Sequence, residues 1–141
     1  GVLAEEDAEA AGEAGVDASV VSNHGGRVMD DMPGTARVLP AIARAVGDRI
    51  PVLADGGIRT GMDAFKMMAL GARGVLVGRP AAIAAVGGET PAVKHLFMRY
   101  AREFAKTMNL CGLSDIEGIR AGYLMRAQEP GSQTVQADLP S

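Results

Sequence analysis

The sequence predicts an α/β fold with a parallel sheet and, within that class, the C-terminal part of a (β/α)8 barrel. Three short apolar runs, at 18–21, 50–54 and 74–77, have the composition of strands buried on both faces, and helical periodicity lies between them. A polar, glycine-rich loop follows each run, whereas the opposite connections are plain. Barrel enzymes carry their sites on the loops after the strands. Because three strands cannot close an eight-stranded barrel, we expect about the last three βα units.

Composition sets limits on the class of protein. The chain has 141 residues, of which 48% are hydrophobic, so it can bury a core and is not a disordered segment. Its formal net charge of -3 gives no argument for nucleic acid or an anionic membrane surface. Since no apolar run approaches the roughly 20 residues of a membrane span, we expect none. The single cysteine, Cys111, forms no internal disulfide, which fits a cytoplasmic protein.

Two helices are expected before and after the first apolar run. The segment 5–14 begins with three acidic residues, which favour a helix N-terminus, and Gly15 follows where a glycine would end the helix. The segment 35–46 is the second helix, with Thr35 as its expected cap. Pro40 is awkward inside this helix and predicts a separate or kinked first turn.

The C-terminal half is mostly helical by its periodicity. Further helices are expected at 62–69, 81–86, 91–108 and 114–117. Thr90 and Pro91 form the clearest start signal, an N-cap followed by proline at the first helical position. Residues 1–128 are therefore expected to form one domain portion, and 129–141 a loose polar tail.

The first loop, Ser22 to Arg27, carries the residue types that chemistry at a small acid requires. His24 has a side chain that exchanges a proton near neutral pH, and Arg27 can bind a carboxylate through two parallel hydrogen bonds. Gly25 and Gly26 allow backbone to approach a ligand closely. The alternative is that the histidine and the arginine are merely solvated loop residues.

The second and third loops favour a phosphate. Glycines leave backbone amides free to face an anion, and an arginine in each loop could hold phosphate oxygens. Two successive βα loops with this composition are typical of the phosphate site of barrel enzymes. Either loop alone could be a tight turn with an exposed arginine. The candidate residues are Asp55, Gly56, Gly57, Ile58, Arg59, Gly78 and Arg79.

Other conspicuous residues are expected to serve structure. An aromatic and methionine stripe at helical spacing indicates core or a subunit interface: Phe97, Tyr100, Phe104 and Met108. His95 is expected on the polar face of its helix, and Cys111 has no nearby histidine pattern that indicates a nucleophile. No cluster of residues has the spacing of a metal site.

In these motifs the sequence resembles the FMN-dependent α-hydroxy acid oxidases and dehydrogenases, which include lactate oxidase, glycolate oxidase and mandelate dehydrogenase. The resemblance extends from about residue 1 to 117, with Gly26 where members vary between glycine and alanine. The motifs that carry it are Ser22-Asn23-His24-Gly25-Gly26-Arg27, Asp55-Gly56-Gly57-Ile58-Arg59-Thr60-Gly61, Leu70-Gly71-Ala72 and Val77-Gly78-Arg79-Pro80.

The resemblance implies a role for each candidate. His24 would be the base, and His24 and Arg27 would bind a small L-2-hydroxy acid such as lactate, which is oxidised to the 2-oxo acid. Ser22 would contact FMN, and the ribityl phosphate would be held by Asp55, Gly56, Gly57, Ile58, Arg59, Gly78 and Arg79. The family also implies a homo-oligomer, often a tetramer.

The family further implies residues that this chain does not contain. A lysine near the flavin would precede Gly1, and the aspartate that orients the histidine, the substrate-binding tyrosines and a second arginine would lie further upstream. The chain is therefore expected to be a fragment that is inactive when isolated. Two alternatives remain: another FMN barrel, such as an isomerase or an enzyme like IMP dehydrogenase, or a non-catalytic segment that associates with other chains. The acid's side chain and the electron acceptor stay open.

Overall fold

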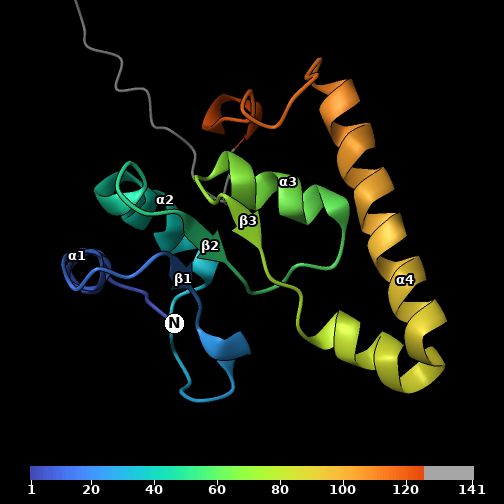
Figure 1. Cartoon of the computed structure of the whole chain (residues 1–141), viewed down its shortest axis with the longest axis horizontal. Helices are drawn as coiled ribbons and strands as arrows, with labels where there is room; N and C mark the ends of the chain where they lie inside the picture. Colours follow the sequence, from blue (N-terminus) through green and yellow to red (C-terminus); the bar gives the residue numbers. More distant parts are fainter. Residues whose placement is uncertain (126–141) are drawn as a thin grey trace, which may run out of the picture.

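The computed structural model describes residues 1–125 and contains a three-stranded parallel sheet (Figure 1). The strands are β1 (Ser19–Val21), β2 (Val52–Ala54) and β3 (Gly74–Val75), and they lie in the order β1-β2-β3. Val20 of β1 is opposite Leu53 of β2, which is opposite Gly74 of β3. The predicted parallel sheet is confirmed, although each strand is shorter than its apolar run.

A fourth segment, not predicted, lies on the outer edge of β1. Val2 forms a parallel bridge with Val21. The Val2 amide donates to the Val20 carbonyl at 2.9 Å, and the Ser22 amide donates to the Val2 carbonyl at 3.3 Å. The start of this chain therefore occupies the place of a preceding parallel strand.

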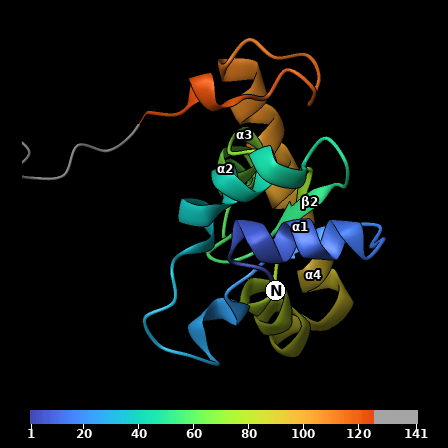
Figure 2. The ribbon, with the colours of Figure 1, turned by 90° about the vertical axis from the view of Figure 1, so that its left-hand side faces the viewer.

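Three helices cover one face of the sheet. They are α1 (Glu5–Glu13), α2 (Thr35–Val46) and α3 (Gly61–Ala69), and each contacts at least one strand; Figure 2 shows α1 lying across the sheet beside α2. Val21 and Val52 face this layer and are fully buried. Val20 and Leu53 alternate with them, since successive strand side chains point to opposite faces, and they are only half-buried. The sequence makes both faces apolar, but residues 1–125 bury one of them more completely.

The start of α2 differs from the prediction. Gly34 is the N-cap, and Thr35 is the first helical residue, so the expected capping role of Thr35 is wrong. Its hydroxyl instead donates to the Asp55 carbonyl at 2.6 Å. Pro40 lies inside a helix that continues to Val46, at the loss of one intrahelical hydrogen bond.

The last long helix, α4 (Arg79–Leu110), consists of two helical halves that meet at a sharp bend (Figure 1). Gly88 and Glu89 have non-helical backbone angles, and the φ of Glu89 is 51°. This break separates the two helices that the sequence predicts, with Pro91 at the start of the second. Beyond Leu110 the chain turns through Gly112, whose φ is 70°.

The predicted helix at 114–117 is wrong. Residues 114–118 form a turn, in which the Asp115 carboxylate accepts from the Gly118 amide at 3.0 Å and the Ile116 carbonyl accepts from the Ile119 amide at 3.1 Å; a segment this short gains too few hydrogen bonds to offset the cost of starting a helix. The next helical turn is η2 (Ala121–Tyr123), which places the Tyr123 ring edge-on to Phe65 at 6.2 Å between centroids. The predicted tail, 129–141, lies outside the described residues.

The aromatic stripe of α4 is divided between core and surface. Tyr100 is buried, and Phe104 packs edge-on against Phe65 of α3 at 6.1 Å, as the core interpretation predicts. Phe97 is exposed. In the part of the chain that the structure describes, no helix is both long enough and apolar enough to cross a membrane.

Candidate active site

A cleft of about 490 Å³ lies where the carboxyl ends of the three strands meet. Apolar side chains that the sequence did not single out, including Leu76 and Ile83, form one wall. Ser22 does not line the cleft but contacts Asp55, which does. Nine of the ten predicted site residues line it, namely His24, Arg27, Asp55, Gly56, Gly57, Ile58, Arg59, Gly78 and Arg79.

The loop after β1 is a tight left-handed turn. His24 has φ 55° and Gly25 has φ 68°, within the short helical turn η1 (His24–Gly26). A positive φ costs energy at a histidine, so hydrogen bonds must hold it. The Ser22 hydroxyl accepts from the His24 amide at 3.0 Å, and the Asn23 side chain accepts from the Gly25 amide at 3.1 Å. The strand end therefore fixes the backbone of His24 at the cleft.

Asp55 links this loop to the loop after β2. Its Oδ2 accepts from the Ser22 hydroxyl at 2.6 Å, and its carbonyl accepts from the Thr35 hydroxyl at the same distance. Thr35 is thus a supporting residue that the sequence did not reveal, because twenty residues separate it from Asp55. The other carboxylate oxygen, Oδ1, is buried and has no hydrogen-bond partner among residues 1–125.

Gly56 allows the second loop to pass close to α2. Its φ is 89°, and an added Cβ would lie 2.6 Å from the Thr35 hydroxyl oxygen. Gly57 continues the turn with φ 78°. The backbone here takes a course that residues with side chains rarely adopt, so its amides can face a ligand directly.

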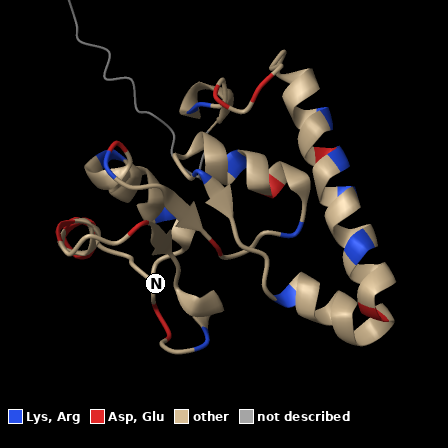
Figure 3. Ribbon diagram, viewed as in Figure 1, with Lys and Arg blue, Asp and Glu red and all other residues tan. Residues whose placement is uncertain are grey.

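The charge of the cleft is mainly positive. Arg27, Arg59 and Arg79 line it with a single carboxylate, that of Asp55. Within residues 1–125 none of these arginines has a carboxylate within 4.0 Å. Figure 3 shows basic segments on the loop after β2 and at the start of α4. Uncompensated guanidinium groups beside free amides suit a phosphate or a carboxylate.

The third loop reaches the first through Arg79. Its Nη2 donates to the Gly25 carbonyl at 3.4 Å, and an added Cβ on Gly25 would lie 3.3 Å from the same nitrogen. The histidine-bearing loop and the arginine-bearing loop are therefore in contact.

The start of α3 has a variant of the capping box, which the sequence could have revealed, in which Asp63 accepts from the amide before the N-cap Thr60. The Thr60 hydroxyl accepts from the Asp63 amide at 3.0 Å, and the Asp63 carboxylate accepts from the Arg59 amide at 3.1 Å. Threonine followed three residues later by an acidic residue is a sequence signal for a helix start. The capping box leaves the Asp63 amide unavailable to a ligand.

Two residues that the sequence analysis set aside, His95 and Cys111, lie away from the cleft. His95 is exposed on α4, and Cys111 is partly buried at its end. In the described part of the chain, no group of three or more histidine, cysteine or carboxylate side chains could hold a metal ion.

Comparison with known proteins identifies relatives of the same kind as the sequence predicts. Over 124 residues the chain is 51% identical to an L-lactate dehydrogenase of Caulobacter vibrioides, and over 129 residues 44% identical to a peroxisomal (S)-2-hydroxyacid oxidase of Arabidopsis thaliana. These alignments cover 88% and 92% of this chain but 32% and 36% of the relatives. The chain thus spans about a third of their length.

Comparison with solved structures leads to the same kind of enzyme. The fold matches a mandelate oxidase variant with a monooxide FMN adduct at a TM-score of 0.83 and 42% identity, over 85% of this chain and 38% of that one. The three βα units therefore form part of a (β/α)8 barrel, as predicted. The model of the family described as FMN-dependent dehydrogenase matches residues 1–126. The chain belongs to the FMN-dependent dehydrogenase family.

Proposed function

We propose that this chain is part of a longer FMN-dependent enzyme that oxidises a small (S)-2-hydroxy acid to the 2-oxo acid. The observation that carries the proposal is the single cleft on which His24 and Arg27 lie together with the two glycine–arginine loops. A base, a carboxylate-binding group and a phosphate site are the three elements that such a reaction requires of these loops.

The residues of the cleft fit FMN in three respects. The Gly56–Gly57 turn offers backbone amides, Arg59 and Arg79 offer uncompensated guanidinium groups, and both suit a phosphate. The buried Oδ1 of Asp55 has no donor among residues 1–125, and a ribityl hydroxyl would supply one. We propose that Asp55, Gly56, Gly57, Ile58, Arg59, Gly78 and Arg79 hold the phosphate side of FMN, with Ser22 supporting Asp55.

We propose that Arg27 binds the carboxylate of the hydroxy acid. A ring nitrogen of His24 takes a proton from this substrate when it is oxidised. The left-handed turn, held by Ser22 and Asn23, keeps the imidazole on the same cleft as Arg27. Bound FMN would accept the two electrons that leave the substrate. Positioning of base and carboxylate relative to one another is the contribution that this segment makes to catalysis.

The substrate class is proposed from the relatives. Their names specify L-lactate, (S)-2-hydroxy acids and mandelate, and all of these have a carboxylate beside the carbon that carries the hydroxyl. The same names favour a hydroxy acid enzyme over an FMN isomerase or an enzyme like IMP dehydrogenase. We further propose a cytoplasmic homo-oligomer: the resemblance to this family implies the assembly, and the lone Cys111, which forms no internal disulfide, fits the cytoplasm.

The proposal is tested by two histidine variants of the complete enzyme that carries this segment. His24→Gln should abolish reduction of the flavin by L-lactate under anaerobic conditions, while FMN stays bound. His95→Gln removes the other histidine, which is exposed on α4, and should leave the rate within twofold of the wild type. Reduction that survives His24→Gln would overturn the assignment of the base.

A further inference from the structure

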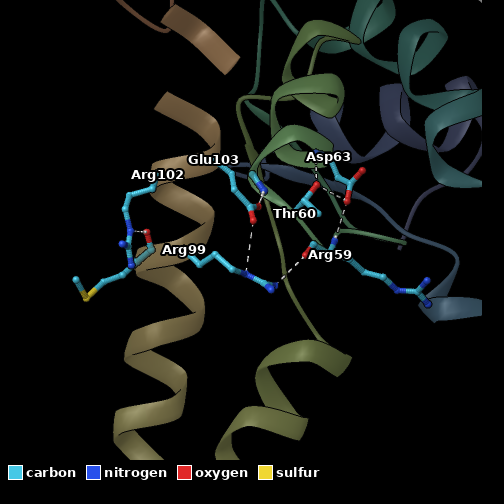
Figure 4. Close-up of polar contacts among 8 residues, drawn as sticks. Arg59, Thr60, Asp63, Arg99, Arg102 and Glu103 are labelled. Carbon is cyan, nitrogen blue, oxygen red and sulfur yellow. Dashed lines mark hydrogen bonds and ion pairs between the residues drawn. The ribbon is translucent and has the colours of Figure 1, made fainter. Parts of the chain in front are cut away.

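The backbone of Arg59 is held from two sides. Its amide donates to the Asp63 carboxylate of α3 at 3.1 Å, and its carbonyl accepts from Arg99 Nη2 of α4 at 3.4 Å. Figure 4 shows the Arg59 side chain leading away from α4, while its backbone faces Arg99. The two helices thus restrain the residue whose guanidinium lines the cleft.

Glu103 makes a second contact from α4 to the same loop. Its Oε2 accepts from the Gly61 amide, the first of α3, at 2.8 Å, and its Oε1 lies 3.6 Å from Arg99 Nε. An ionised acceptor strengthens such a bond, and a carboxylate is favourable at a helix N-terminus. The Gly61 amide is thus already hydrogen-bonded to Glu103, as the Asp63 amide is to the Thr60 hydroxyl.

The absence of a side chain at Gly61 makes this contact feasible. A Cβ there would overlap the Tyr100 carbonyl oxygen and the Phe104 nitrogen of α4. The two helices therefore approach one another at the residue that ends the phosphate-site loop. Glu103 lies at this crossing and is only partly exposed.

Helix α4 connects the loop that carries Arg59 with the loop that carries Arg79. Its first residue is Arg79, and after the bend at Gly88–Glu89 its second half returns to the loop after β2 (Figure 1). The amides of Gly61 and Asp63, at the start of α3, already have hydrogen-bond partners. A bound phosphate would therefore take its hydrogen bonds from the amides of the loop after β2 and from Arg59 and Arg79. Their placement relative to one another therefore depends on α4.

We infer that Arg99 and Glu103 are positioning residues, which hold the Arg59 loop in the conformation that binds the flavin phosphate. The inference rests on the proposed function and deepens it, because it assigns supporting residues that lie 40 and 42 residues in sequence from the loop residues they bond. Neither residue lines the cleft.

The test compares FMN with riboflavin, which lacks the phosphate, by fluorescence titration of the full chain. Arg99→Gln and Glu103→Ala should each weaken FMN about fivefold and leave riboflavin within twofold, since a lost supporting hydrogen bond is of this size. Glu103→Gln keeps an acceptor oxygen and should recover most of the affinity. A merely structural role would weaken both flavins equally.

Arg102→Gln is the matched control. Arg102 is on the same helix and carries the same charge. Among residues 1–125 its side chain donates only to the Met98 carbonyl of α4, at 3.2 Å, and Figure 4 shows it directed away from the loop. It should leave the ratio of FMN to riboflavin affinity unchanged. A ratio that stays at the wild-type value in Arg99→Gln and Glu103→Ala would overturn the inference.

A second measurement does not depend on flavin. Hydrogen exchange of residues 56–61 should accelerate in Arg99→Gln but not in Arg102→Gln, while exchange of β1 stays the same. Unchanged exchange in 56–61 would overturn the inference even if the chain failed to bind FMN. A wild-type chain with equal affinity for both flavins would instead contradict the proposed phosphate site itself.

Discussion

Substitution of Gly56 by alanine tests how closely the loop after β2 packs against α2. The φ of 89° is outside the range that alanine prefers, and strain of this kind costs about 1–2 kcal/mol. The new Cβ would lie 2.6 Å from the Thr35 hydroxyl oxygen, well inside the 3.4 Å at which ordinary contact begins. Thr35 is buried and cannot turn away without losing its bond to the Asp55 carbonyl, worth about 1 kcal/mol. The total destabilisation expected is about 2–3 kcal/mol.

Gly57→Ala provides the control for backbone strain. Its φ of 78° is similar, but no atom lies within 4 Å of the added Cβ, so only the strain of about 1–2 kcal/mol is expected. Urea unfolding followed by circular dichroism measures both variants. The double variant Gly56→Ala, Thr35→Ala has no hydroxyl for the new Cβ to meet. Its loss of stability should therefore be smaller than the sum of the losses in the two single variants. Equal stability of the two glycine variants, or strictly additive losses in the double variant, would refute the steric argument.

Three further predictions concern the core, the C-terminal turn and the site. Leu39→Ala should cost about 2–5 kcal/mol in urea unfolding, because its side chain is fully buried, whereas Val86→Ala, at a residue that is 90% exposed, should change stability by less than about 0.5 kcal/mol. Tyr123→Ala should lower the free energy of unfolding by about 1 kcal/mol or more, since it removes the edge-on contact with Phe65; a Tyr123→Phe control should retain it. Ser22→Ala should weaken FMN binding about tenfold in a fluorescence titration and lower the free energy of unfolding by about 1–2 kcal/mol, because it removes the bonds to the Asp55 carboxylate and the His24 amide; unchanged FMN affinity would show that the serine does not support the site.

The sheet and the cleft were predictable from sequence because each depends on a local pattern. Short apolar runs such as Val52–Ala54 became parallel strands, and parallel strands bring the loops at their carboxyl ends to one edge. Residues from 22–27, 55–59 and 78–79 therefore met on one cleft or directly behind it. The break between the two halves of α4 followed from Gly88 in the same way.

What the sequence did not reveal depends on contacts between distant segments. The Thr35 hydroxyl bonds the Asp55 carbonyl in place of the expected capping bond, because Gly34 is the N-cap and Thr35 is the first residue of the helix. The contacts of Arg99 and Glu103 with the Arg59 loop arise only from the return of α4. Val2 pairs with β1 as an isolated residue, too short a segment for periodicity to identify. The predicted helix at 114–117 failed because a segment this short, followed by Gly118, gains too few hydrogen bonds to offset the cost of starting a helix.

The central claim is that the cleft after the three strands binds the phosphate of FMN. Titration of the chain with FMN, and in parallel with riboflavin, tests it most directly through flavin fluorescence and absorbance. We predict saturable binding of FMN at least about tenfold tighter than that of riboflavin, because in the proposed site the phosphate would contact Arg59, Arg79 and the amides of the Gly56–Gly57 turn, all of which line the cleft. Equal affinity for the two flavins would contradict the assignment of these loops as the phosphate site.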